Sequence, residues 1–258
     1  MRSLMSKKSA QLVGLLVIVQ FLLLVIIPSI VSSAPPLDVV EGLVWAPHWL
    51  IGTYKHPPLP AWIIELFVRV TGNVIWGPFI ASQLAVGLAY HFIYRLGRLI
   101  FDPFRAAAGT MLIAASYYFT VPTIEFNHNT IQLPLWSGTI YLYALIRREP
   151  KNLLLWLLLG ALAGLSFYAK YSYAVLLVTL ALASVVEPSM RRIWFSFGPW
   201  LAMALCALLV APHLTWLIHN DFEPLTYLSE RAESRTASDP LMFILTQILD
   251  HLPMIIPL

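Results

Sequence analysis

Two acidic residues and a Lys-His-Pro-Pro run lie in one polar stretch that follows the first long apolar segment of the chain. Asp38 and Glu41 are three residues apart, a spacing that places both carboxylates on one side of a short helical turn. Lys55 and His56 offer two cationic or hydrogen-bonding side chains on a backbone that the next two prolines stiffen. This pattern suits an acid–base group beside a phosphate holder. A solvated carboxylate at Glu41 and a purely structural Lys-His-Pro-Pro loop are the simpler alternatives.

A second polar group interrupts the apolar sequence between two further segments. Glu125, Asn127, His128 and Asn129 all lie within five residues, where they need partners or a ligand if water is absent. Glu125 and His128 could hold a divalent metal, but two ligands without a recognised spacing define no metal site. A turn whose side chains satisfy one another is the alternative. These residues alone leave both interpretations open.

Two more cations stand near apolar segments. Lys170 follows one such segment and is flanked by three tyrosines, so its ammonium group either snorkels to the membrane interface or neutralises a lipid phosphate. Arg231 lies in the last polar stretch, after an aromatic and polar segment at 212–222 that could cover a cleft. Lys170 is therefore a candidate phosphate ligand.

The composition shows that membrane-spanning elements must position these residues. Hydrophobic residues make up 59% of the chain and charged residues 11%, with a mean hydropathy of +0.76, which indicates an integral membrane protein. The net charge of +3 does not indicate nucleic-acid binding, because the basic residues stand in small groups at the ends of apolar segments. The single cysteine, Cys206, excludes an intramolecular disulfide and a cysteine-based metal site.

Apolar segments close to the roughly 20 residues needed to cross a bilayer recur along the whole chain. The sequence therefore predicts an all-α, polytopic transmembrane bundle of about eight spans that forms a single domain over 1–258. The first span is expected to be retained, since it is longer than the core of a signal peptide. The last one runs to Leu258, so we expect a chain truncated at its C-terminus. The predicted spans are 11–31, 74–94, 106–122, 130–146, 153–169, 171–186, 193–212 and 241–258.

The basic residues give the orientation of this bundle. With the N-terminus in the cytoplasm, alternation of the spans places eleven of the sixteen Lys and Arg residues on the cytoplasmic side. The positive-inside rule was not used to place the spans, so it supports the topology independently. These eleven residues are Arg2, Lys7, Lys8, Arg95, Arg98, Arg105, Arg147, Arg148, Lys151, Arg191 and Arg192.

The candidate site residues then share the external face. The two long polar segments, 32–73 and 213–240, lie there together with the short turns at 125–129 and at Lys170. Residues 61–70 are typical of an amphipathic helix in the membrane interface, with Glu65 and Arg69 paired on one side. Three of its side chains are expected to face the lipid: Trp62, Ile63 and Phe67.

Taken in order, these pieces resemble the membrane glycosyltransferases that include protein O-mannosyltransferases and bacterial lipid A aminoarabinose transferases, which have the GT-C fold. Asp38 is similar to the first acidic residue of the family's first external loop, and Tyr54–Leu59 resembles the turn that closes this loop. Gly164–Tyr171 and Pro212–Phe222 resemble two further family segments. The resemblance runs through essentially the whole chain.

The chain departs from the family pattern at two positions. Val39 follows Asp38 directly, where members commonly have Glu, and the next acid is Glu41. Asn129 stands where many members have an acidic residue, which puts a metal requirement in doubt. No cofactor is therefore certain, and a divalent metal remains possible.

The resemblance implies a sugar transferase at the external face of a bacterial inner membrane. The donor would be a sugar on a polyprenyl phosphate, and the acceptor a hydroxyl group of a lipid, glycan or protein. Asp38 would remove the acceptor proton in an inverting displacement. The residues that would stabilise the departing phosphate are Lys55, His56, Lys170 and Arg231. The remaining residues that would bind substrate are Glu41, Glu125, Asn127, His128 and Asn129.

Two other classes of protein fit a polytopic helical chain. A transporter also has many spans with a few polar groups, but it usually carries ionisable residues inside the membrane, whereas here they gather at one face. A non-catalytic membrane subunit or fragment is the third interpretation.

Overall fold

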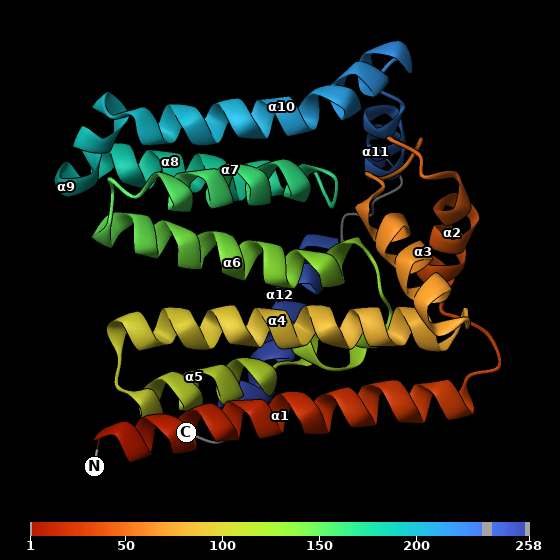
Figure 1. Cartoon of the computed structure of the whole chain (residues 1–258). Coiled ribbons are helices and arrows are strands. Elements are labelled where there is room, and N and C mark those ends of the chain that lie inside the picture. The colour runs from red at the N-terminus through yellow and green to blue at the C-terminus, as the bar shows by residue number, and fades with distance from the viewer. Residues whose placement is uncertain (1, 234–238, 256–258) are drawn as a thin grey trace.

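The computed structural model describes residues 2–233 and 239–255, and within these residues the chain forms α-helices and 3-10 turns and no β-strand. The all-α prediction is therefore confirmed. Six long helices lie roughly side by side, as Figure 1 shows, and they correspond to predicted apolar segments. They are α1 (Arg2–Val31), α4 (Trp76–Ile100), α6 (His128–Arg148), α7 (Leu153–Phe167), α8 (Tyr173–Val186) and α10 (Phe197–His219).

Shorter elements gather at the two ends of these helices (Figure 1). At one end lie α2 (Leu37–Trp45), η1 (Ala46–His48), α3 (Leu59–Thr71) and α11 (Glu223–Glu233). We call this the site end. The opposite end carries the start of α1, the α6–α7 turn, the turn from α4 to α5 (Pro103–Ala114), and α9 (Pro188–Arg191), and we call it the basic end. The two ends separate the candidate site from the arginine-rich turns as predicted, while the membrane side of each end stays a prediction.

Few of the helices could cross a membrane unaided. Residues 6–31 and 197–219 are each long and apolar enough to do so. Two bent helix pairs are long and apolar enough only when each pair is taken together: α3 with α4, at 119°, and α8 with α9 and η4 (Arg192–Phe195), at 99°. A helical membrane bundle is thus confirmed, and the number of eight spans stays a prediction.

The predicted span at 106–122 is wrong as a continuous helix. Helix α5 covers only Pro103–Ala114 and is followed by two 3-10 turns, η2 (Tyr117–Phe119) and η3 (Val121–Ile124). The Ser116 hydroxyl donates to the carbonyl of Ile113 at 2.7 Å, and Pro122 has no N–H to continue a helix. Side-chain hydrogen bonds to the backbone thus compete with the helix in this segment.

A polar network satisfies the backbone of these turns. The Gln20 amide of α1 donates to the carbonyl of Phe119 at 2.8 Å, and the Tyr90 hydroxyl of α4 donates to Gln20 Oε1 at 2.8 Å. Gln83 Nε2 donates to the carbonyl of Thr123 at 2.9 Å. Irregular backbone inside a membrane protein requires such internal partners. The network therefore fixes the segment that leads into 125–129.

Helix α3 forms where the sequence predicts it, but its apolar side chains do not face the lipid as expected. Glu65 and Arg69 make the predicted ion pair at 2.6 Å. The exposed apolar side chains are Leu66 and Val70. The 119° bend between α3 and α4 turns the other apolar face of α3 inward. The three residues expected in the lipid pack instead against a buried core cluster: Trp62, Ile63 and Phe67.

Helices α7 and α10 approach closely because α7 carries two glycines four residues apart. A Cβ atom at Gly160 would lie 2.5 Å from the carbonyl oxygen of Ala202, and one at Gly164 would lie 2.7 Å from Cβ of Leu209. Small residues at this spacing let membrane helices pack backbone to backbone. This contact holds the end of α10 near the site end.

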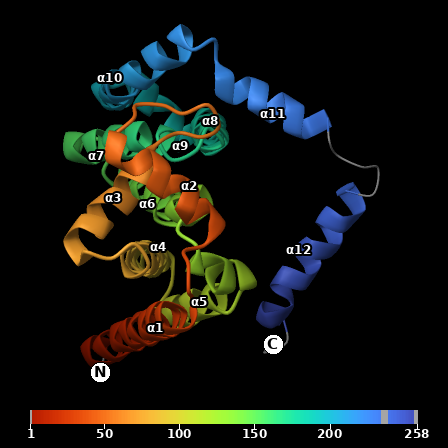
Figure 2. The ribbon, with the colours of Figure 1, turned by 90° about the vertical axis from the view of Figure 1, so that its right-hand side faces the viewer.

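The predicted span at 241–258 corresponds to α12 (Asp239–Ile255), and 256–258 lie outside the described residues. Figure 2 shows α11 and α12 to one side of the long helices.

Candidate active site

Three polar side chains from distant parts of the sequence meet at the site end. Asp38 lies in the first turn of α2, where its backbone N–H donates to Glu125 Oε1 at 2.7 Å. The amide Nδ2 of Asn127 donates to Asp38 Oδ2 at 2.9 Å. We call Asp38, Glu125 and Asn127 the acidic centre. It brings together the first polar stretch and the turn before α6, which the sequence predicts to share a face.

Asn127 has two roles, and together they fix its orientation. As the N-cap of α6, its Oδ1 accepts the backbone N–H groups of Asn129 at 2.9 Å and Thr130 at 3.1 Å. Its Nδ2 is then directed to Asp38. An aspartate could cap the helix equally well but could not donate to a second carboxylate. The amide at this position is therefore matched to Asp38.

The carboxyl group of Glu125 is affected by its burial and by Asp38. Burial raises the pKa of the Glu125 carboxyl, and the negative charge of Asp38 raises it further, while the hydrogen bond from the Asp38 backbone opposes these effects. The Thr130 hydroxyl also donates to the carbonyl of Glu125 at 2.8 Å, which fixes the backbone there. Glu125 is therefore held in place from both sides.

Lys55 is paired with Glu41 in this structure. Its Nζ lies 3.0 Å from Oε1 and 2.8 Å from Oε2 of Glu41, so both carboxylate oxygens accept from one ammonium group. Burial alone would lower the pKa of Lys55, but the bonded Glu41 carboxylate outweighs it and the pKa is raised. Glu41 thus neutralises the cation expected to bind phosphate.

His56 and His128 lie against each other, with ring centroids 4.3 Å apart. His128 Nε2 lies 3.0 Å from the carbonyl oxygen of Pro57, which can only accept, so this nitrogen carries the proton. Burial, followed by the neighbouring His56, lowers the pKa of His128 to about 3. Neutral His128 therefore ties the start of α6 to the Lys-His-Pro-Pro run.

Lys170 contacts the site through an amide and not through an acid. Its Nζ donates to Asn129 Oδ1 at 2.6 Å. Burial lowers the pKa of Lys170. Among the residues that the structure describes, no carboxylate lies in ion-pair distance of this ammonium group. Lys170 is thus a half-buried cation that a phosphate could neutralise.

His213 is a positioning residue that the sequence does not single out. It is buried in α10, where its Nδ1 donates to the carbonyl of Ile51 at 2.6 Å. Its Nε2 accepts from the Tyr171 hydroxyl at 3.0 Å. Trp216 stacks on the imidazole and fills the space beside Gly52. These contacts fix the loop before Lys55. The sequence signal was a His and a Trp three residues apart in the 212–222 segment.

Helix α11 lies over the Lys-His-Pro-Pro run. The ring centroid of Tyr227 is 6.1 Å from that of His56 and 5.8 Å from Lys55 Nζ. Arg231 belongs to the same helix, but its side chain lies outside the described residues, so its predicted role is untested. Within the described chain, no three metal-ligating side chains converge, and a divalent metal stays a prediction.

Residues 55–216 match the family described as dolichyl-phosphate-mannose-protein mannosyltransferase. This match covers more than half of the chain and includes Glu125, Asn127, Lys170 and His213. The chain belongs to this mannosyltransferase family. The predicted resemblance to GT-C membrane glycosyltransferases is thereby confirmed.

The chain is similar to glycosyltransferases of two bacteria. The chain is 25% identical over 215 residues to the lipopolysaccharide core galacturonosyltransferase RgtA of Rhizobium johnstonii, which covers 80% of this chain and 42% of the relative. It is 31% identical over 181 residues to the undecaprenyl phosphate-alpha-4-amino-4-deoxy-L-arabinose arabinosyl transferase of Pseudomonas aeruginosa, covering 67% of this chain and 32% of the relative. The chain thus spans less than half of the length of these relatives. No solved structure matches the chain significantly.

The mannosyltransferase-family match begins at Lys55, so Asp38 and Glu41 precede it. The structure nevertheless connects both acids to residues inside the matched region, Asp38 to Asn127 and Glu41 to Lys55. The first polar stretch is therefore part of the same structural unit.

Proposed function

We propose that this protein transfers a sugar from a polyprenyl-phosphate donor to a hydroxyl group of an acceptor at the site end, which we place on the external face of a bacterial inner membrane. The names of the relatives support this choice: one names an undecaprenyl-phosphate-linked sugar and another the lipopolysaccharide core. A lipopolysaccharide hydroxyl is therefore the acceptor we favour over a protein or another glycan.

Asp38 is the group that we propose to accept the proton. Asn127 holds one of its carboxylate oxygens, Oδ2, and the link from its backbone to Glu125 fixes the start of α2. This leaves Oδ1 for the acceptor hydroxyl. As the acceptor oxygen bonds to the anomeric carbon, its proton passes to Asp38 and the bond from that carbon to the phosphate oxygen breaks.

The departing polyprenyl phosphate carries negative charge that the site must stabilise. Lys170 is suited to this because no carboxylate of the described residues pairs with it, and its partial burial strengthens an interaction with phosphate. Lys55 is already paired with Glu41 and would take part only if the phosphate replaces that carboxylate. His56 follows Lys55 and contacts His128, which precedes the Lys170 partner Asn129, and we assign both histidines to binding and not to proton transfer.

The observation that carries this proposal is that a fixed carboxylate and a cation without an ion pair among the described residues lie at the same end of a membrane bundle. Asp38 is joined to Asn127, two residues before Asn129, and Asn129 accepts from Lys170. A base for the acceptor and a cation for the leaving phosphate are thus linked through the first turn of α6.

Product analysis tests this function. Membranes that contain the chain would be incubated with polyprenyl-phosphate sugars labelled in the sugar and with lipopolysaccharide as acceptor. We expect label on the acceptor, release of polyprenyl phosphate, and inversion at the anomeric carbon. Retention of configuration would exclude the single displacement, and no transfer by folded protein would contradict the proposed activity.

A further inference from the structure

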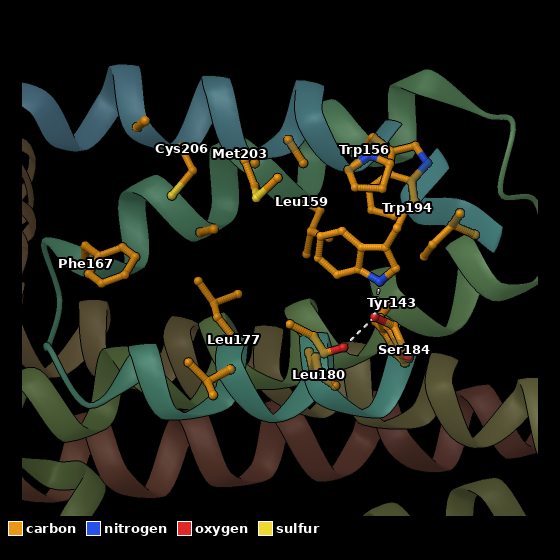
Figure 3. A pocket seen from close by; sticks show the side chains of 18 of the residues that line it. Tyr143, Trp156, Leu159, Phe167, Leu177, Leu180, Ser184, Trp194, Met203 and Cys206 are labelled. Carbon is orange, nitrogen blue, oxygen red and sulfur yellow. Dashed lines mark hydrogen bonds between the residues drawn. The ribbon is translucent and has the colours of Figure 1, made fainter. Parts of the chain in front are cut away.

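A second site is indicated by a cavity that no residue of the acidic centre lines. It has a volume of about 470 Å³ and lies between α7, α8 and α10, closed at the basic end by η4. Figure 3 shows Phe167 toward one end of it and Trp156 and Trp194 toward the other. A volume of this size is in the range of small-molecule sites.

The lining of the cavity excludes water as its natural occupant. Most of its side chains are aliphatic or aromatic. The Trp194 indole donates to Ser184 Oγ at 2.9 Å, so these two polar groups have hydrogen-bond partners within the protein. The Trp156 indole donates to the carbonyl of Pro150 at 2.9 Å. Water needs several polar partners in a cavity, whereas hydrocarbon needs none. The surrounding bilayer supplies hydrocarbon chains.

The dimensions of the cavity fit one lipid chain. Its lining residues on α7 run from Trp156 to Phe167, which at the helical rise is about 16 Å. Half of a hydrocarbon core of about 30 Å is about 15 Å. The exposed side chains Val178 and Met203 on opposite walls show that the cavity also reaches the surface of the bundle. The cavity is thus as deep as one leaflet.

Polar groups at the basic end are suited to bind the headgroup and the glycerol ester of a phospholipid. The Tyr143 hydroxyl lines the cavity, is buried, and has no hydrogen-bond partner in the described part of the chain. Arg192 is exposed and directly precedes the lining residues Ile193 and Trp194, and no ion pair is found for it among the described residues. Basic groups beside grooves between membrane helices bind anionic headgroups.

We propose that this cavity binds one acyl chain of an anionic phospholipid, with the lipid phosphate at Arg192 and a glycerol ester carbonyl accepting from the Tyr143 hydroxyl. The site is separate from the proposed sugar transfer, because neither Asp38 nor Lys170 lines the cavity and the headgroup is placed at the basic end. A bound lipid would fill the space between α8 and α10 and stabilise the α7–α10 pair.

Native mass spectrometry of the purified full chain with phosphatidylglycerol or phosphatidylcholine tests the site. We expect one retained phosphatidylglycerol, favoured over phosphatidylcholine. Arg192→Gln should reduce this preference about fivefold, while Lys151→Gln, an exposed cation at the same end, leaves it unchanged. Equal retention of both lipids by the parent, or no effect of Arg192→Gln, would overturn the headgroup assignment.

Photo-crosslinking with phosphatidylglycerol that carries a diazirine in its acyl chain tests the cavity itself. Adducts should map to the cavity-lining residues of α8 and α10, including Cys206. They should be lost in Ala181→Phe, which fills the cavity, and kept in Ala183→Phe, which is exposed on the same helix. Ala207→Phe fills the cavity from α10 should the first variant not fold. Adducts spread over all exposed faces, or displacement by polyprenyl phosphate but not by unlabelled phosphatidylglycerol, would overturn the proposal.

Discussion

At the scale of single residues, the site depends on a few side chains that each serve two partners. Asn127 caps α6 and holds Asp38, and His128 begins α6 and holds the Pro57 carbonyl. The sequence predicted that these residues lie together, because their segments share a face. It could not predict that Glu41 neutralises Lys55, since that pairing depends on how the 46–54 loop folds back onto α2.

Replacement of Asn127 by Asp should separate capping from catalysis. The aspartate still caps α6, but it removes the donor to Asp38 and places a second negative charge beside it. We expect transfer to fall about 100-fold with little change in the unfolding temperature. Asn152→Asp, at an exposed position of the basic end, is the control. Equal activity of the two variants would show that the Asn127 donor has no role.

The buried His128 should make stability depend on pH. Its pKa is about 3 in the folded protein and ordinarily 6.5, so below pH 6.5 the unfolded chain binds a proton that the folded chain does not. The free energy of unfolding should therefore fall as the pH drops from 6.5 toward 3, by up to about 1.4 kcal/mol per pH unit. His128→Gln keeps a donor for Pro57 and should flatten this slope. The measurement is a series of denaturant titrations at different pH values. If the free energy of unfolding falls equally with pH in the parent and in His128→Gln, His128 is not the cause.

At the scale of elements, apolar segments predicted where most long helices lie, because burial in lipid requires continuous apolar sequence. The α5 segment shows the limit of this rule. Its composition fits a span, but Ser116 and Pro122 end the helix, and the resulting turns need the Gln20 and Gln83 amides as partners. Such side-chain competition with the backbone is local chemistry that hydropathy does not record.

The close contact between α7 and α10 is tested by Gly160→Ala. The added Cβ would lie 2.5 Å from the Ala202 carbonyl oxygen, so the two backbones must move apart. We expect a loss of about 1–3 kcal/mol in the free energy of unfolding, because overpacking outweighs the better helix propensity of alanine. Gly109→Ala, where no atom lies within 4 Å, should be neutral or stabilising. Unfolding curves of both variants measure these free energies. A Gly160→Ala protein with the parental free energy of unfolding would refute the packing role of Gly160.

At the scale of the whole molecule, the basic end and the site end define two faces. The basic residues predicted this separation before any packing was known, because their turns must share one membrane side. The sequence could not predict how α11 lies over the Lys-His-Pro-Pro run, since that contact depends on Tyr227 and on the end of α10.

Cysteine labelling tests which end is external. In a Cys206→Ala background, Ser33→Cys lies before α2 at the site end and Ser189→Cys lies in α9 at the basic end; both positions are exposed. A membrane-impermeant maleimide should label Ser33→Cys in intact cells and Ser189→Cys only after permeabilisation. The reverse pattern would place the site end in the cytoplasm.

The central claim is that the Asp38 carboxylate accepts the acceptor proton in sugar transfer. The most direct measurement is the initial rate of transfer from a radiolabelled polyprenyl-phosphate sugar by the parent, by Asp38→Asn and by Asp221→Asn, an exposed acid beyond α10. The account predicts that Asp38→Asn loses about 100-fold or more while Asp221→Asn keeps the parental rate. An Asp38→Asn protein with full transfer activity would contradict it.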